Sequence, residues 1–195
     1  MGTPPTSHSA LEVPRTGPCR IPTVTTQRLI LRSFTTDDLD AYAELTADEQ
    51  TMRYLGEGGP LDRAGTWRVL AVILGHWHLR GYGIWAMADR ATQRLIGRAG
   101  LYYPEGWPAL EVVWSVARDR WGQGLATEAG QAALDYAFEQ LSADHVISTI
   151  HPRNHASIRV AEKLGQTFEY GPTNLQGRER MVYGITRSTW LRSRP

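Results

Sequence analysis

One carboxylate and two glycines share a short stretch of the chain, and their order suggests a chemistry. Glu111 opens an apolar run to Val116 that predicts a buried strand, and Gly122 and Gly124 follow in a turn that opens a helix. Glycines let the backbone bend and approach a ligand closely, and the first N–H groups of a helix lack intrahelical partners. Those donors and the helix dipole favour a phosphate group. On the glycines alone, a phosphate site and a plain strand–turn–helix junction both remain open.

The turn has a more specific resemblance. Residues 121–126, Trp-Gly-Gln-Gly-Leu-Ala, form neither a Walker loop nor a dinucleotide fingerprint. They resemble the pyrophosphate-binding loop of GNAT acetyltransferases, Gln/Arg-x-x-Gly-x-Gly/Ala, with Trp121 at the position usually held by Gln or Arg. That Trp, and the Thr-Glu-Ala continuation at 127–129, are similar to the RimJ/RimL-like branch. Members of this ribosomal-protein N-terminal acetyltransferase type acetylate protein N-termini and assorted small amines.

A second match lies downstream, at residues 154–165. This segment resembles the N-x-x-S-x-R-x-x-E-K-x-G helix of the same family, which borders the pantetheine arm. It also has the pattern of an ordinary capped helix, with Asn154 as N-cap and Gly165 as C-terminal stop. Both interpretations hold together. The resemblance covers about residues 25 to 190.

The expected fold class is α/β. Antiparallel strands followed by βα alternation predict a central mixed, mostly antiparallel sheet of about seven strands with helices on both faces, the GNAT fold. Residues 1–24, rich in proline, predict a flexible leader, and 25–190 a single GNAT acetyltransferase domain. The strands are expected at 27–32, 82–87, 94–103, 110–116, 145–150, 167–170 and 180–186, and the helices near 39–45, 62–78, 122–140 and 154–164.

The resemblance implies acetyl-CoA as cosubstrate and assigns residues to it. The cofactor-binding set is Trp114, Ser115 and Val116 on the strand, Trp121, Gly122, Gln123, Gly124, Leu125, Ala126 and Thr127 in the loop, and Asn154 and Ser157 downstream. The acceptor is a primary amine, either a peptide N-terminus or a small molecule. An amine attacks a thioester only as the neutral base, so the site needs a proton acceptor. Glu111 is the predicted catalytic base, directly or through water.

The group that protonates the departing thiolate is less obvious. Many family members carry a Tyr at the position held here by Ala161. Ser157 is the nearest hydroxyl in the motif and is the second catalytic candidate, although it could equally be a simple coenzyme contact. A free thiol has a pKa near 8.5 and needs no dedicated acid. The aromatic loop from Tyr102 to Trp107 lies beside Glu111 in sequence and is a candidate for contact with the acceptor.

Composition limits the other classes of function. A formal net charge of +1 gives no sign of a nucleic-acid partner. A single cysteine excludes an intramolecular disulfide and a cysteine-based metal cage, and we expect no metal. With neither a membrane span nor a signal peptide, we expect a cytoplasmic bacterial enzyme, monomer or homodimer. The alternative hypotheses are a degenerate GNAT domain that binds or senses acetyl-CoA without turnover, and an unrelated phosphate-binding regulatory domain.

Overall fold

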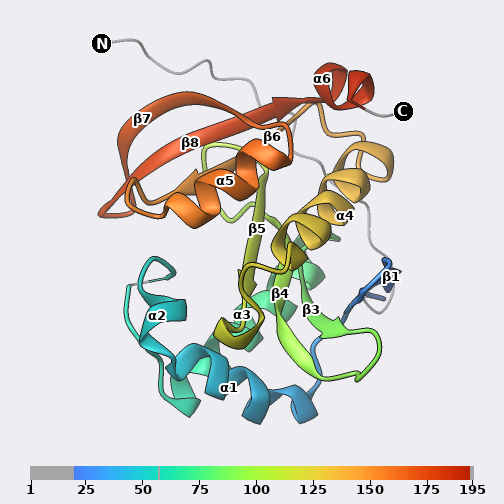
Figure 1. Ribbon diagram of the computed structural model, residues 1–195, viewed down its shortest axis with the longest axis vertical. Helices are drawn as coiled ribbons and strands as arrows, with labels where there is room; N and C mark the ends of the chain where they lie inside the picture. Colours follow the sequence, from blue (N-terminus) through green and yellow to red (C-terminus); the bar gives the residue numbers. More distant parts are fainter. Residues whose placement is uncertain (1–19, 57, 194–195) are drawn as a thin grey trace.

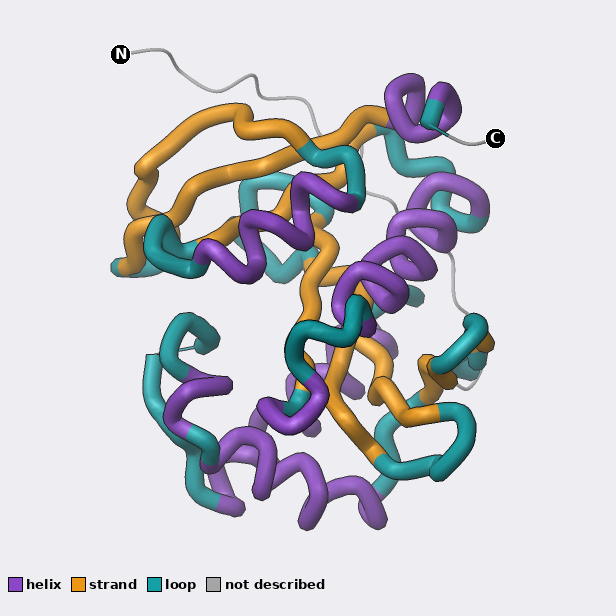
Figure 2. Tube along the Cα trace, viewed as in Figure 1, coloured by secondary structure: helices purple, strands orange, loops and turns teal. Residues whose placement is uncertain are grey.

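The computed structural model describes residues 20–56 and 58–193, which build one sheet with flanking helices (Figures 1 and 2). The strands are β1 (Val24–Thr25), β2 (Leu29–Arg32), β3 (Ile84–Asp89), β4 (Leu95–Tyr102), β5 (Glu111–Val116), β6 (His145–Ile150), β7 (Thr167–Leu175) and β8 (Arg178–Thr186). The helices are α1 (Leu39–Ala47), α2 (Glu49–Met52), α3 (Arg63–Arg80), α4 (Leu125–Glu139), α5 (His155–Lys163) and α6 (Arg187–Arg192), with 3-10 turns η1 (Thr36–Asp38) and η2 (Arg118–Arg120).

The sheet is mixed and has the order β1-β2-β3-β4-β5-β6-β8-β7. Every neighbouring pair is antiparallel except β5 and β6, which are parallel. A parallel pair needs a crossover, and α4 supplies it. The predicted fold class is therefore confirmed. The described residues hold eight strands rather than about seven, because the two-residue β1 carries too little pattern to be seen in the sequence.

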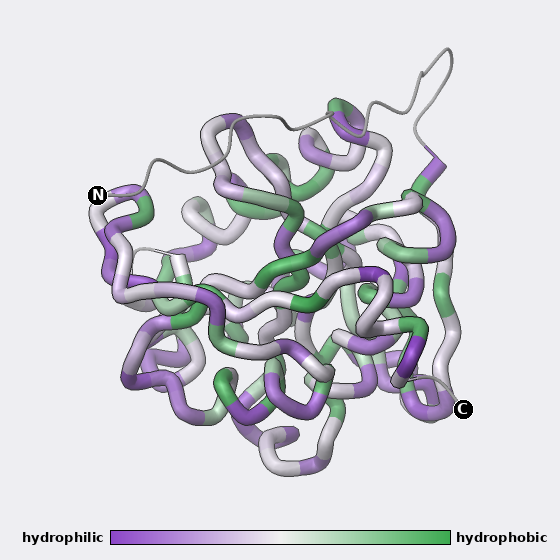
Figure 3. The backbone as a smooth tube through the Cα atoms, turned by 90° about the horizontal axis from the view of Figure 1, so that it is seen from above, coloured by the Kyte–Doolittle hydropathy of each residue, from purple (hydrophilic) through white to green (hydrophobic). Residues whose placement is uncertain are grey.

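The helices lie on both faces of the sheet. In Figure 1, α4 and α5 lie in front of it and α3, drawn fainter, lies behind. Apolar side chains of α3, α4 and the central strands fill the core, and hydrophobic segments run through the middle of the molecule in Figure 3. Trp77 of α3 and Trp85 of β3 are fully buried and meet edge to face, 5.0 Å between ring centroids. Both tryptophans therefore belong to the hydrophobic core.

Several predicted boundaries move for identifiable reasons. The helix predicted from about residue 122 begins at Leu125, because Gly122 and Gly124 adopt φ of +74° and +76°, outside the helical region. The strand predicted at 167–170 extends through β7 to Leu175 and forms a long hairpin with β8. The short helices α2 and α6 were not predicted, since four and six residues hold little periodicity.

The predicted leader is described only from residue 20 onward, and residues 1–19 lie outside the described part. Ile21 and Val24 pack against the core, and Trp85 donates from Nε1 to the Pro22 carbonyl oxygen at 2.8 Å. Contacts with the domain thus begin before the predicted boundary at residue 25.

Candidate active site

The two parallel strands β5 and β6 separate soon after they meet. Their pairing consists of one register pair, Glu111 with Ile147, and the Ile147 N–H donates to the Leu110 carbonyl at 2.8 Å. A continuing parallel ladder would next join the Thr149 N–H to the Val112 carbonyl. Instead, that N–H donates to Glu111 Oε1 at 2.8 Å, and the Val112 carbonyl accepts from Ser148 Oγ at 3.0 Å. The Glu111 carboxylate therefore replaces the Val112 carbonyl as the acceptor of the next interstrand hydrogen bond.

The separation leaves backbone groups of β5 facing the gap. The Ala117 N–H donates to Ile96 of β4, so alternate residues of β5 face β4, and Trp114 and Val116 face the opposite side, toward β6. Ser115, predicted together with them, has its backbone turned toward β4, and its buried side-chain oxygen has no partner among the described residues. The carboxyl ends of two parallel strands that diverge form a crevice where ligands commonly bind.

The glycine turn lies at the open end of this gap. Gly124, in the left-handed region, is the N-cap of α4 and brings no capping side chain. The first backbone bond of the helix runs from the Glu128 N–H to the Gly124 carbonyl, so the N–H groups of Leu125, Ala126 and Thr127 precede the ladder. A Cβ built on Gly122 would meet no described atom within 4 Å. These features form the donor array that an anion needs at a helix N-terminus.

An ion pair between Arg28, the residue before β2, and Glu128 of α4 holds the turn in place. Arg28 donates from Nη1 to the Gln123 carbonyl at 2.8 Å and from Nε to Glu128 Oε2 at 2.6 Å. Thr26 Oγ1 donates to Glu128 Oε1 at 2.6 Å. Burial opposes ionisation of Glu128, but the hydrogen bonds from Thr26 and Arg28 outweigh it and lower the pKa of this carboxyl. Trp121, half exposed, is fixed by donation from its Nε1 to the Val116 carbonyl at 2.7 Å.

Glu111 is buried, with 5% of its surface exposed, and its carboxylate accepts three hydrogen bonds. Oε1 accepts from the N–H and Oγ1 of Thr149 at 2.8 and 2.9 Å, and Oε2 accepts from Trp107 Nε1 at 2.7 Å. Burial disfavours the charged form and raises the pKa of Glu111 to about 7, although these donors and Arg180 act in the opposite direction. A carboxyl that titrates near neutrality is suited to accept a proton.

The aromatic loop before β5 reaches Glu111, as its sequence position suggested. Tyr102 and Trp107 meet edge to face at 5.6 Å. His76 of α3 stacks on Tyr102 at 5.3 Å and accepts from the Tyr103 N–H through Nε2 at 3.0 Å. Burial lowers the pKa of His76, so its ring is neutral and acts as a support. The loop is thereby fixed beside the carboxyl.

The second motif forms the opposite flank of the gap. Asn154 caps α5, with Oδ1 accepting from the Ser157 N–H at 3.2 Å. Ala161, where many family members carry a Tyr, is fully buried against Ile150 and Tyr183. Because β6 leads into α5 and β5 leads through the glycine turn into α4, both helix N-termini border the splayed ends of the strands (Figure 1). The structure thus brings the two motifs to one crevice.

Sequence reasoning missed two partners of the site. Thr149 holds Glu111 from a neighbouring strand, and Arg180 of β8 acts electrostatically on the same carboxyl. Both lie far from Glu111 along the chain and belong to no local motif, so only strand pairing reveals them.

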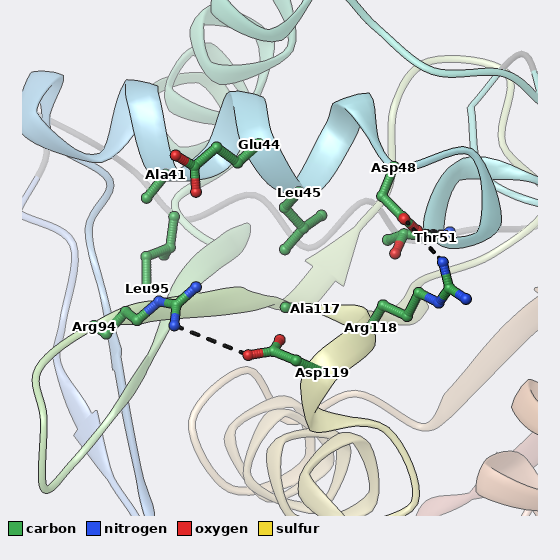
Figure 4. A pocket seen from close by; sticks show the side chains of 10 residues that line it. All are labelled: Ala41, Glu44, Leu45, Asp48, Thr51, Arg94, Leu95, Ala117, Arg118 and Asp119. Atoms are coloured by element: carbon green, nitrogen blue, oxygen red, sulfur yellow. Dashed lines mark hydrogen bonds and ion pairs between the residues drawn. The ribbon is translucent and has the colours of Figure 1, made fainter.

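A cavity of about 480 Å³ lies away from Glu111, between α1 and the segment that follows β5 (Figure 4). Ion pairs join Arg118 to Asp48 at 3.7 Å and Arg94 to Asp119 at 3.9 Å. None of the predicted site residues lines this cavity.

The family follows from comparison with known proteins. A family profile described as "Acetyltransferase (GNAT) domain" matches residues 28–167. The uncharacterized N-acetyltransferase YnaD of Bacillus subtilis is 30% identical over 75% of this chain and 83% of its own length. YkkB of the same species, an uncharacterized protein, is 37% identical, but the match spans 48% of this chain and only 58% of YkkB.

Solved structures agree with this family. An acetyltransferase from Agrobacterium tumefaciens superimposes with a TM-score of 0.75 and 32% identity, covering 89% of this chain and 99% of the other. RimL, the ribosomal L7/L12 alpha-N-protein acetyltransferase solved with coenzyme A, shares the fold at 16% identity and a TM-score of 0.70, over 85% and 98% of the two chains. The chain belongs to the GNAT family of acetyltransferases. It is a GNAT N-acetyltransferase, which confirms the predicted enzyme class.

Within residues 20–56 and 58–193, no group of three or more His, Cys, Asp or Glu is placed to hold a metal ion. No helix in the same ranges is long and apolar enough to cross a membrane.

Proposed function

We propose that the protein transfers the acetyl group of acetyl-CoA to a primary amine, either a protein N-terminus or a small-molecule amine, as a member of the RimJ/RimL-like branch. The observation that carries the proposal is the junction of β5 and β6. The strands part at a buried carboxyl with a pKa of about 7, and a glycine turn at a helix N-terminus lies at the open end. Trp121 and the Thr-Glu-Ala continuation at 127–129 support the branch.

The pyrophosphate of the coenzyme binds at the glycine turn, where the N–H groups of Leu125, Ala126 and Thr127 and the α4 dipole meet it. The pantetheine arm then runs along β5 between the diverging strands. In that position the N–H groups of Trp114 and Val116 face the arm. Asn154 and Ser157 border the arm from the α5 side.

The chemical step places a neutral amine against the thioester carbonyl carbon. The amine nitrogen forms the new C–N bond, the carbonyl oxygen carries the developing charge, and the C–S bond then breaks to release the thiolate of CoA. The amine loses one proton, and Glu111 accepts it. Because only 5% of Glu111 is exposed and three donors already surround it, the proton reaches the carboxylate through a bridging water.

The thiolate takes up a proton after release, since a free thiol has a pKa near 8.5. Ser157, in the first turn of α5, donates that proton or holds the water that does. Ala161 cannot supply it, because its side chain is a methyl group buried in the core.

The test has two stages. Calorimetric titration with acetyl-CoA, CoA, ATP and NAD measures the ligand preference, and we expect tight binding of acetyl-CoA and CoA only. Thiol release is then followed against arrayed peptides, polyamines and aminoglycosides. Binding of acetyl-CoA without thiol release from any amine would overturn the transfer reaction and support the degenerate domain. Equal binding of ATP and NAD would overturn the coenzyme assignment.

A further inference from the structure

A second cavity is lined in part by Arg180, the residue of β8 that acts electrostatically on Glu111. It has a volume of about 610 Å³ and lies between the turn after β6 and the tip of the β7–β8 hairpin. Its lining residues are His151, Gln176, Gly177, Arg178, Glu179 and Arg180. Arg180 links this cavity to the proposed reaction centre, since its guanidinium lowers the pKa of Glu111 electrostatically.

The cavity is rich in guanidinium groups. Arg178 and Arg180 line it, and both side chains are half-buried. Arg53, exposed, lies over the Tyr54 ring at 5.3 Å, and that ring lies against His151 at 4.8 Å. Two arginines therefore line the cavity, against one acidic lining residue, the exposed Glu179, and Arg53 lies behind its His151 wall across the Tyr54 ring.

Arg180 is the most informative of these cations. Burial lowers the pKa of Arg180, the neighbouring Arg178 lowers it further, and Glu111 raises it. Among the described residues Arg180 forms no ion pair within 4.0 Å, and its Nη1 donates to the carbonyl of Glu179 at 3.1 Å. A half-buried cation beside a like charge is costly unless an anion compensates it.

We propose that this cavity binds a carboxylate of the acceptor, so that the substrate is an amine that carries a carboxylate, with its amine toward Glu111 and its carboxylate on Arg180 and Arg178. The inference rests on the proposed acetyl transfer and names its substrate class. A guanidinium presents paired donors that match a carboxylate in a bidentate geometry. The same arginines repel polycationic acceptors such as polyamines and aminoglycosides.

Matched acceptors test the proposal with the full chain. The first pair is a peptide with Asp at its second position and the same peptide with Asn there. The second pair is a free amino acid and its carboxamide, and spermidine is the cationic probe. We expect kcat/KM at least about tenfold higher for the carboxylate member of at least one pair, as loss of a charge-assisted hydrogen bond implies. The pair that responds distinguishes a peptide source from a small-molecule source.

Substitutions of the two lining arginines test whether they cause the preference for carboxylate acceptors. Arg180→Gln should reduce kcat/KM for the carboxylate acceptor to that of its amide, with the acetyl-CoA dissociation constant unchanged. Arg178→Gln should reduce it in part. The control is Arg68→Gln, which removes an equal charge from an exposed position on α3 outside the cavity and should keep the preference.

The outcomes separate this inference from the proposed function. Turnover in which amides and spermidine equal the carboxylates, or an Arg180→Gln variant that keeps the preference, overturns the carboxylate subsite and leaves acetyl transfer standing. Absence of thiol release with every acceptor overturns the reaction itself and the inference with it.

Discussion

Replacing Glu111 by Gln should remove the part of the pH dependence of acetyl transfer near neutrality that comes from this carboxyl. The wild-type carboxyl has a pKa of about 7, raised by burial. It accepts a proton only in its ionised form, so activity should increase as the pH rises through 7. With this pKa, roughly one tenth of the carboxyl is ionised at pH 6 and roughly nine tenths at pH 8, so this group contributes an increase of about tenfold in kcat/KM, on top of the increase from the neutral fraction of the amine.

The loss at pH 8 should be about 10²–10⁴-fold, the usual contribution of a general base. Acetyl-CoA affinity should stay nearly intact, because Glu111 lies at the closed end of the strand pair and the glycine turn at the open end. A further rise in pH should partly rescue the variant, since more of the acceptor is already neutral. The rescue should be stronger for a lysine-like amine than for an α-amine, whose neutral fraction saturates sooner.

Trp107→Phe is the matched control, because it removes the indole N–H that donates to Glu111 Oε2 and leaves the carboxylate itself in place. This control should therefore retain the pH dependence. The midpoint of its pH–activity profile should move upward, because in the wild type the hydrogen bond from Trp107 lowers the pKa of Glu111 and the variant lacks it. Thiol release measured from pH 5.5 to 9 decides the question. If Glu111→Gln keeps more than about a third of wild-type activity at pH 8, the proton leaves by another route.

The same carboxyl should affect stability in a defined pH range. Its folded pKa is raised from 4.5 to about 7, so the folded state holds this proton more tightly than the unfolded state. The free energy of unfolding should therefore fall by about 3 kcal/mol from this group as the pH rises from 4.5 to 7. Denaturant unfolding of wild type and Glu111→Gln at both pH values measures the difference, and an equal pH dependence in the two proteins would contradict the burial argument.

Three further changes test the coenzyme turn and the start of the domain. Gly122→Val forces a branched side chain into φ of +74° and should weaken acetyl-CoA binding at least about tenfold in calorimetry; a folded variant of unchanged affinity would refute the loop assignment. Arg28→Gln should loosen the turn and raise the acetyl-CoA dissociation constant several-fold while leaving the acceptor KM unchanged. Deleting residues 1–24 removes the acceptor of the Trp85 indole N–H and should lower the melting temperature by about 2–10 °C. Deleting residues 1–19 keeps that acceptor and should leave the melting temperature unchanged. Equal melting temperatures of the two deletion variants would show that the Trp85 contact contributes nothing to stability.

Local pattern predicted much of this protein. The strand at 145–150 was predicted with its observed ends, and Asp62 and Asn154 cap α3 and α5 as their residue types suggest. The glycine turn could be predicted because a backbone that needs positive φ favours glycine at those positions, and Gly122 and Gly124 both have positive φ. The aromatic loop was placed beside Glu111 because Trp107 lies four positions before that residue along the chain.

Residues distant in sequence decided the rest. Nothing in Thr149 or Arg180 marks them as neighbours of Glu111, since each belongs to a strand that pairs with the others only in the assembled sheet. The titration of Glu111 near pH 7 likewise depends on burial, which no local pattern specifies. The sequence alone therefore determined the two family motifs and the carboxyl that precedes them. Tertiary structure decided where β5 and β6 part and which cations face the carboxyl, because strand pairing and desolvation arise only when the whole sheet closes around it.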